Sequence, residues 1–404
     1  MQLPDGIRKS ANVVLCLVAV AGIGFSGREI WQNLHSRWQI DAGCGGLVPA
    51  GRVLALDRAG GEIIHRRADS GTIELDGLPE GVEQCDLFSE EAGGRWFFIG
   101  AVGVHPMEAA LVTDDQMLPP VDQFDSRTYP AQPLGGGITG SLDDQGVRVE
   151  MPCTGGEVAG KPVKALWAWA GLEPPSIFTD WGQPGDDDRD VLAEIAVITA
   201  NNLAERLGCA ERLPDPPADL PALPEGPVPV GRAEGTCAWY RESGLAARTG
   251  FPDEVLEGRV DDTLSDEPCA LVVSRSEALA TYRALQEERD LLSSPDLPGQ
   301  WFVTLHTYRG EQAKNVSAAG GSGDDIPARP GTAGRTPGNT VWWASSQCDG
   351  TPQLHTMTIG HGYDRVVAAD AEDLFRVYVT EITDRRDCTD LAFPESDSFS
   401  RPQD

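Results

Sequence analysis

The chain has 404 residues, with 63 acidic and 32 basic side chains and a formal net charge of −31. Its length and its 40% hydrophobic content, including ten Trp, are sufficient for two or three packed domains and exclude disorder throughout. The negative field repels DNA, RNA and anionic lipid headgroups. We therefore expect no nucleic-acid partner.

The first 40 residues predict a membrane anchor. Arg8 and Lys9 precede an apolar run over residues 11–26, and Arg28 follows it. This run is short but adequate for a transmembrane helix, and the positive-inside rule places residues 1–10 in the cytoplasm. We predict an anchor over 11–27 with the rest of the chain outside the membrane. A cleaved signal peptide is the alternative, although no clear A-x-A site follows the run.

Residues 28–40 form a juxtamembrane segment with two tryptophans. Trp31 and Trp38 are seven residues apart, which is a helical spacing. The segment therefore either extends the anchor helix beyond the membrane or seats Trp31 at the interface.

Eight cysteines lie outside the predicted anchor, an even number that favours disulfides in an exported chain. No C-x-x-C pair occurs and no histidine lies within a few residues of a cysteine, so we predict neither a metal site nor a cofactor. Four cysteines in each half allow three connectivities. We predict a repeated pairing that ties an opening helix to an early strand and a later strand to the end of a closing helix. The predicted pairs are Cys44 with Cys85, Cys153 with Cys209, Cys237 with Cys269, and Cys348 with Cys388.

Residues 213–235 contain seven prolines in 23 positions, which predicts an extended, semi-rigid linker. The segments on either side, 41–212 and 236–394, show the same order of features. In each, a strand-like Trp-Phe segment follows the second cysteine, an alternating strand pattern follows the third, and an amphipathic helix ends on the fourth. The predicted fold is α+β: after one transmembrane helix come two similar tandem domains, each an antiparallel sheet packed with helices and joined by disulfides.

The two segments differ by insertion and by their long polar stretches. Residues 274–298 have no counterpart in the first segment, and their centre predicts an added helix. The stretches 107–145 and 308–339 exceed the usual loop length, so they are either functional or disordered, and their composition favours disorder. We also expect a disordered tail over 395–404.

The order of membrane segment, cysteines, strands and closing helix resembles uncharacterised exported domains of actinobacteria. Those domains are similar to the PsbP-like α/β sandwich, in which an antiparallel sheet packs against helices. Here the domain would occur in tandem. The resemblance implies no activity, and so it gives no residue a catalytic role.

Two motifs have plainer explanations than ligand binding. The segment 135–140, GGGITG, fits G-x-G-x-x-G, but prolines precede it and no helical pattern follows, so we interpret it as a flexible loop. The acidic run 186–190, DDDRD, lacks the glycine and the final glutamate of a calcium loop. It lies just before a predicted helix, where acids favour the helix dipole.

His355 and His361 are the only candidate catalytic pair, because even spacing on a strand would place both on one face. They could bind metal or act as a base, but we favour polar residues at a strand edge. Trp167, Trp169, Trp342 and Trp343 could form a stacking platform, but we favour core packing.

Two hypotheses of function remain open. We expect a membrane-anchored extracytoplasmic binding or structural module, without evident catalysis, whose partner is an unknown protein or envelope component. The alternative is a cell-envelope hydrolase that uses His355 and His361, with acids such as Asp364 nearby.

Overall fold

The computed structural model describes residues 15, 28, 30–65, 71–79, 81–104, 109–112, 130–172, 185–218, 220–224, 226–285, 301–319, 325–336, 341–360 and 362–399. Residues 1–10 and the predicted anchor over 11–27, residue 15 apart, lie outside this set. Within the described part of the chain, no helix has the length and apolar character needed to span a bilayer.

The N-terminal half is built on a seven-stranded antiparallel sheet in the order β1-β2-β3-β10-β7-β6-β5. Its strands are β1 (Ile63–Ile64), β2 (Glu83–Ser89), β3 (Trp96–Gly103), β10 (Ala165–Leu172), β7 (Gly146–Pro152), β6 (Gly140–Leu142) and β5 (Gln132–Pro133). The helical segments of this half are residues 30–43, α2 (Ala50–Val53), η1 (Leu75–Gly77) and α3 (Asp186–Leu207). A small hairpin of β8 (Glu157–Val158) and β9 (Lys161–Pro162) precedes β10.

The C-terminal half is built on an eight-stranded sheet in the order β11-β12-β13-β14-β19-β18-β17, with β20 also paired to β18. Its strands are β11 (Val228–Pro229), β12 (Glu254–Glu257), β13 (Asp266–Val272), β14 (Phe302–Arg309), β19 (Thr351–Ile359), β18 (Val341–Cys348), β17 (Gly334–Arg335) and β20 (Thr389–Ala392). Its helices are η2 (Val230–Arg232), α4 (Ala238–Ser243), η3 (Leu245–Ala247), α5 (Arg275–Ala284), α6 (Gly310–Ala313), α7 (Asp364–Val367), α8 (Ala371–Arg385) and η5 (Ser396–Phe399). The predicted added helix is α5, where the Ser274 hydroxyl accepts a hydrogen bond from the Glu277 N–H and caps the first turn.

Six strands of each sheet follow the same chain order. The path β1-β2-β3-β10-β7-β6 of the first sheet corresponds to β12-β13-β14-β19-β18-β17 of the second. A long helix then follows the last central strand in both halves, α3 in the first and α8 in the second. The predicted α+β class with antiparallel sheets and helices is confirmed.

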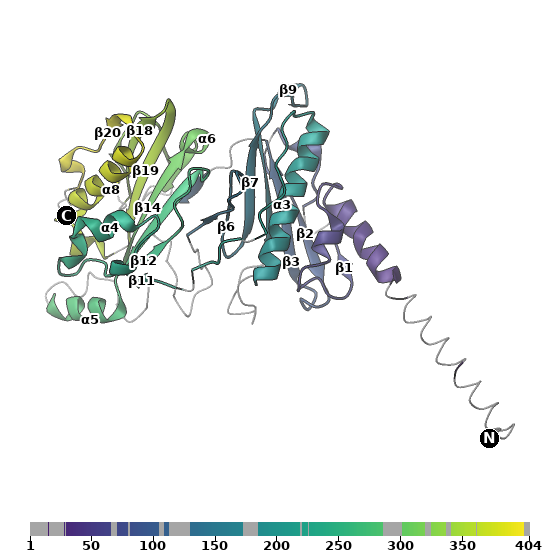
Figure 1. Ribbon diagram of the computed structural model, residues 1–404, viewed down its shortest axis with the longest axis horizontal. Coiled ribbons are helices and arrows are strands. Elements are labelled where there is room, and N and C mark those ends of the chain that lie inside the picture. Colours follow the sequence, from purple (N-terminus) through teal and green to yellow (C-terminus); the bar gives the residue numbers. More distant parts are fainter. Residues whose placement is uncertain are drawn as a thin grey trace, which may run out of the picture.

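The two long helices are placed by sequence features at their ends and by one apolar face. Acidic residues occupy the first turn of α3, and Gly208 ends it in the left-handed conformation. Leu192, Ile195 and Leu203 are buried against the first sheet. In Figure 1, α3 covers the outer face of the first sheet and α8 covers the outer face of the second, so both sheets lie between the helices. The inner faces of the sheets are therefore turned toward one another.

All four predicted disulfides are present. Cys44 bonds Cys85, Cys153 bonds Cys209, Cys237 bonds Cys269, and Cys348 bonds Cys388. The second bond of each half joins the end of a strand, β7 or β18, to a cysteine two or three residues past the end of the long helix. The first bonds begin differently, because Cys44 follows the helix 30–43, whereas Cys237 immediately precedes α4.

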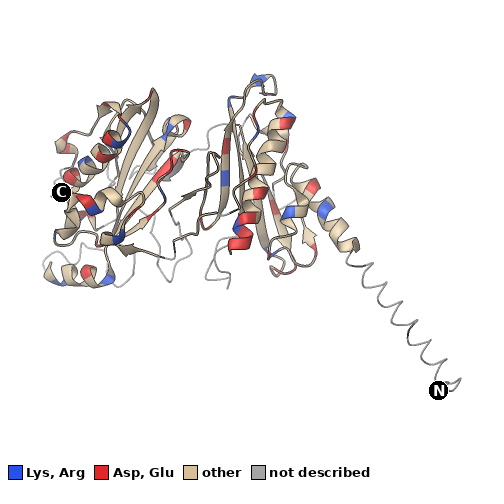
Figure 2. Cartoon of the chain, in the orientation of Figure 1, with Lys and Arg blue, Asp and Glu red and all other residues tan. Residues whose placement is uncertain are grey.

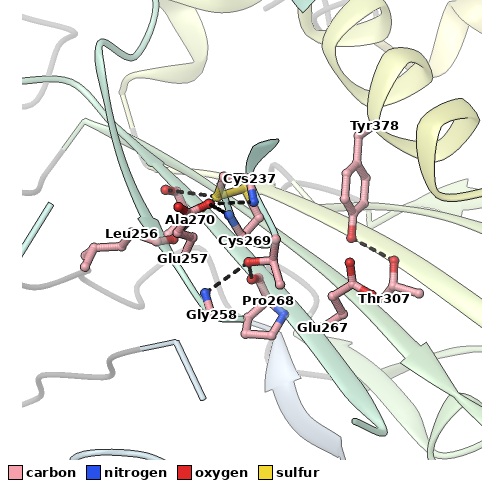
Figure 3. Close-up of a disulfide and its surroundings, with 12 residues drawn as sticks. Cys237, Leu256, Glu257, Gly258, Glu267, Pro268, Cys269, Ala270, Thr307 and Tyr378 are labelled. Atoms are coloured by element: carbon pink, nitrogen blue, oxygen red, sulfur yellow. Dashed lines mark hydrogen bonds between the residues drawn. A yellow bond between two sulfur atoms is a disulfide. The ribbon is translucent and has the colours of Figure 1, made fainter. Parts of the chain in front are cut away.

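The surroundings of the Cys237–Cys269 bond show how the start of α4 is fixed (Figure 3). The Glu257 carboxylate accepts hydrogen bonds from the backbone N–H groups of Glu234, Gly235 and Cys237, at 2.8, 2.9 and 3.1 Å. These bonds satisfy donors that precede the helix and would otherwise lack partners. The loop before α4 is thus held to the end of β12.

The two long polar stretches contain more structure than the sequence predicts. In 107–145, the described residues form β4 (Ala109–Val112), β5, β6 and the start of the turn before β7, and Leu134, Ile138 and Leu142 are buried. In 308–339, they form α6, β15 (Val316–Ala319), β16 (Asp325–Ala328) and β17. The prediction of disorder is therefore wrong for these parts. A few apolar side chains are enough to order such a segment when its backbone pairs with strands from elsewhere in the chain.

The tail is also partly ordered. Residues 396–399 form η5, in which the Phe399 ring stacks on Trp342 with centroids 5.5 Å apart. The Ser398 carbonyl accepts a hydrogen bond from the Trp342 indole N–H at 3.2 Å. The expected disorder over 395–404 is wrong up to residue 399, and residues 400–404 lie outside the described set.

Contacts join the two halves. The strand β4 (Ala109–Val112) pairs in parallel with β15 of the C-terminal half. The buried Gln132 side chain donates to the Glu257 carbonyl at 3.3 Å and accepts from the Arg259 N–H at 3.1 Å. Of the predicted linker 213–235, the described residues of 213–227 contain no helix or strand, whereas residues 228–229 form β11 and residues 230–232 form η2.

We expect removal of one disulfide to lower stability without changing the fold of the other half. Replacing both cysteines of the Cys348–Cys388 bond with Ser should lower the free energy of unfolding by about 2–4 kcal/mol, because the unfolded chain gains freedom. Urea denaturation of the purified chain measures the change. The matched variant lacks Cys153–Cys209, and an unchanged midpoint in either variant would contradict the expectation.

Candidate functional site

His355, the first residue of the predicted catalytic pair, lies in the interior of the C-terminal half. It belongs to β19, which is flanked by β14 and β18, and its side chain is fully buried. Its Nδ1 lies 2.9 Å from the Thr307 hydroxyl, and its Nε2 lies 3.0 Å from the Ser346 hydroxyl. The expectation of a strand-edge histidine is therefore wrong. His361 lies outside the described residues.

The surroundings of His355 keep its ring neutral. Burial, assisted by the positive charge of Arg386, lowers the pKa of His355 to about 3. In the neutral ring one nitrogen donates and the other accepts, which matches two hydroxyl partners. The Thr307 hydroxyl also lies 2.7 Å from the Tyr378 hydroxyl of α8. This arrangement links the sheet to the helix and leaves neither ring nitrogen available to a substrate.

A buried carboxylate lies on the same face of the sheet. Glu267 of β13 is 1% exposed and forms ion pairs with both Arg385 and Arg386 at the end of α8. Gln353 accepts a further hydrogen bond from Arg386 at 3.2 Å. Figure 3 shows Glu267 beside the hydrogen bond between Thr307 and Tyr378. Two cations and the desolvated acid thus fix the carboxyl end of α8 on the sheet.

The four tryptophans do not form one platform. Trp342 faces α8, whereas its neighbour Trp343 belongs to a separate buried cluster on the other face of β18. Trp167 and Trp169 lie on β10 of the first sheet. Core packing is confirmed for Trp167, Trp342 and Trp343, which are at most 8% exposed. Trp169 is half-buried.

The strongest candidate site is a group of charged side chains between the two sheets, which we name the inter-sheet cluster: Arg148, Glu150, Asp266 and His306. Arg148 and Glu150 form an ion pair on β7, and Trp169 lies across from Arg148 on the neighbouring strand. Asp266 of β13 and His306 of β14 approach to 3.0 Å. The four side chains are 15–29% exposed, so the group is partly open to solvent.

The charges of the inter-sheet cluster influence one another across the two halves. Burial lowers the pKa of Arg148 to about 10, and the negative charges of Asp266 and Asp143 oppose this shift. Burial also lowers the pKa of His306, but the charge and hydrogen bond of Asp266 outweigh it, so the pKa lies above its ordinary value. Asp266 therefore stabilises a cation in each half.

The same face of the second sheet carries buried hydroxyl groups. Thr356 and Thr358 alternate with Met357 and Ile359, whose side chains belong to the core under α8. Both threonines are 1% exposed, and no hydrogen bond in the described part of the chain engages the Thr358 hydroxyl. A cation, two carboxylates, an imidazole, hydroxyls and an indole can together bind a polar ligand.

Sequence reasoning missed the inter-sheet cluster, since its members come from strands far apart in the chain. The only signal is a charged pair, Arg148 and Glu150, at alternate positions of an otherwise apolar strand. Figure 2 shows acidic residues along both halves of the chain, so composition does not single out this face.

The two predicted motifs are placed as the sequence suggests. The GGGITG segment forms the turn between β5 and β6, and no helix follows it. Asp186, Asp187 and Asp188 occupy the first turn of α3, as Glu372 and Asp373 do in α8. Among the described residues, no group of three or more His, Cys, Asp or Glu side chains is arranged to hold a metal ion.

Comparisons of the chain with protein-family models, with curated proteins and with solved structures found no match.

We expect His355 to make the protein less stable in acid. Its folded pKa lies below the unfolded value near 6.5, so the unfolded chain binds the extra proton and stability falls as the pH drops from about 6.5 toward 3. The slope for one proton is about 1.4 kcal/mol per pH unit. In the His355→Gln variant, urea denaturation should show a smaller loss of unfolding free energy across this pH range. The same dependence on pH as in the native chain would contradict the low pKa of His355.

His306 should have the opposite effect, which makes His306→Gln the matched control. Its folded pKa is raised, so its contribution is present below the unfolded pKa and is lost as the pH rises through the folded pKa. The variant should therefore lose stability mainly at low pH. Equal losses for His306→Gln above and below neutral pH would argue against the pairing with Asp266.

Proposed function

We propose that this protein is a membrane-anchored extracytoplasmic binding protein, in which two copies of one sheet-and-helix domain form a single body. Residues 1–10 would lie in the cytoplasm, and residues 11–27 would cross the membrane. The single observation that carries the proposal is the repetition of strand order and disulfide pairing in the two halves.

Duplication is supported by correspondences that extend beyond strand order. The bonds Cys153–Cys209 and Cys348–Cys388 each join a cysteine just past a long helix to the end of the equivalent strand. The bonds Cys44–Cys85 and Cys237–Cys269 each reach the equivalent strand, β2 or β13. We place the domains at residues 41–212 and 236–394, joined by the linker 213–235, with β11, η2 and η5 packed on the second domain.

An extracytoplasmic location is supported by the four disulfides, because such bonds persist in oxidising compartments. The apolar run over 11–26 and its flanking cations give the direction of insertion. The partner would be a protein or another envelope component.

We place the ligand at the inter-sheet cluster. Side chains there are half-buried, come from both halves and include both signs of charge beside Trp169. A ligand that binds there removes water from the polar groups of the site. The site therefore favours a ligand that makes hydrogen bonds with these groups in place of that water. His355 is a poor candidate for the hydrolase alternative, since its nitrogens are already engaged in the core.

The predicted topology can be tested with reporters fused after Asp404. A reporter that is active only outside the cytoplasm should be active, and a reporter that is active only in the cytoplasm should be silent. The matched control exchanges Arg8 and Lys9 for Ser, which weakens the positive-inside signal. Activity of the cytoplasmic reporter on the native chain would contradict the proposal.

The binding site can be tested by capture of envelope components on the immobilised full chain. The native chain and Arg52→Met should retain the same component, because Arg52 pairs with Glu194, outside the cluster. Arg148→Met should retain it at least about tenfold more weakly, the loss expected for a central charged contact. Retention by all three chains would place the ligand elsewhere, and retention by none would contradict a binding function. A thermal melt of each variant confirms folding.

A further inference from the structure

The helix over residues 30–43 carries a large exposed apolar surface. Ile30, Trp31, Leu34 and Trp38 are 59–62% exposed, and they make up half of the eight exposed large hydrophobic residues in the described chain. His35 lies between the two indoles, with ring centroids 5.0 Å from Trp31 and 6.0 Å from Trp38. Such a contiguous aromatic surface marks an interaction site.

The opposite side of this helix is already occupied by the protein. Ile40 is fully buried, and the Ser36 hydroxyl accepts a hydrogen bond from the Ile63 N–H at 3.2 Å. Gln39 accepts a further bond from the His65 N–H at 3.4 Å. The helix is therefore fixed to the N-terminal half by one face and presents the apolar face outward.

We propose that this helix lies along the membrane surface, with Ile30, Trp31, Leu34 and Trp38 in the headgroup layer. This inference rests on the proposed membrane anchor, whose apolar run ends four residues before Ile30. The anchor brings the start of the helix to the bilayer boundary. Trp residues are enriched in that layer, because an indole has both an apolar ring and a polar N–H.

The length of the apolar stripe determines the orientation of the helix. At 1.5 Å per residue, Trp31 and Trp38 are separated by about 10 Å along the axis. One headgroup layer is only about 5–7 Å thick, so a helix perpendicular to the membrane would leave Trp38 in water. Both indoles reach the layer only when the axis lies near the membrane plane.

The net charge of the chain favours an uncharged lipid surface over a second copy of the chain or anionic lipid. The net charge of −31 makes a second copy of the chain a repulsive partner and also opposes anionic lipid. Burial of the apolar stripe, rather than charge, must then drive the contact, so uncharged lipid should be sufficient. The C-terminal half would be held away from the bilayer, since the contact involves the opposite end of the molecule (Figure 1).

The test uses the full chain in vesicles of phosphatidylcholine alone. Cys16→Ser removes the thiol outside the four disulfides, and single spin labels are placed at Leu34→Cys, at Trp38→Cys and, as a control, at Leu391→Cys of β20, an exposed residue in the C-terminal half. Collisions with oxygen report lipid, and collisions with a water-soluble nickel complex report solvent. Two labelled positions on the helix guard against one substitution that disturbs folding.

We expect the labels at positions 34 and 38 to be rich in oxygen collisions and several-fold poorer in nickel collisions than the label at 391. Equal nickel access at 38 and 391 would overturn the proposal, as would dipolar broadening between labels, which indicates a second copy on this face. Flotation of the chain with the vesicles tests the anchor separately. A chain that floats but keeps position 38 in water would contradict this inference alone, whereas one that does not float would contradict the anchor as well.

Discussion

The attachment of each long helix at its carboxyl end is the constraint on which the rest of the fold depends. Cys209 and Cys388 follow α3 and α8 and bond to Cys153 and Cys348 at the ends of central strands. A helix fixed at that point must run back across its sheet, and its apolar face then covers one side only. The other side of each sheet is left for polar residues and for the opposite half.

Different polar contacts fix the carboxyl ends of the two long helices. In the second half, Arg385 and Arg386 neutralise the buried Glu267, so removal of one arginine leaves a desolvated charge less well compensated. In the first half, Arg206 donates to the carbonyl groups of Gly45 and Gly46 instead. Arg206 and Arg385, each three residues before the last cysteine of its half, thus correspond in sequence but not in partner.

Features coded by local pattern could be predicted, and features set by distant pairing could not. The strands β3, β10, β14 and β19 and the two long helices follow from periodicity, and the disulfide pairing follows from the repeated order of cysteines, helices and strands. The edge position assigned to His355 is wrong because strand order in the sheet is not written in the strand itself. The stretches 107–145 and 308–339 looked disordered because residues such as Ile138 and Val316 are sparse, yet each is buried by strands far away in the sequence. The inter-sheet cluster escaped detection for the same reason.

The two proposed surfaces have different physical characters, and this difference bears on how the molecule works. The helix over 30–43 carries exposed aromatic rings. Their transfer out of water is favourable and requires no specific partner. The inter-sheet cluster carries half-buried charges. Binding to them is favourable only when the polar groups of the ligand match their geometry. The first surface is therefore suited to orientation and the second to recognition. Because β4 pairs with β15 and Gln132 bonds to the backbone at the end of β12, a helix seated on the membrane would orient both halves together. The direction in which the inter-sheet cluster opens would then be fixed relative to the bilayer.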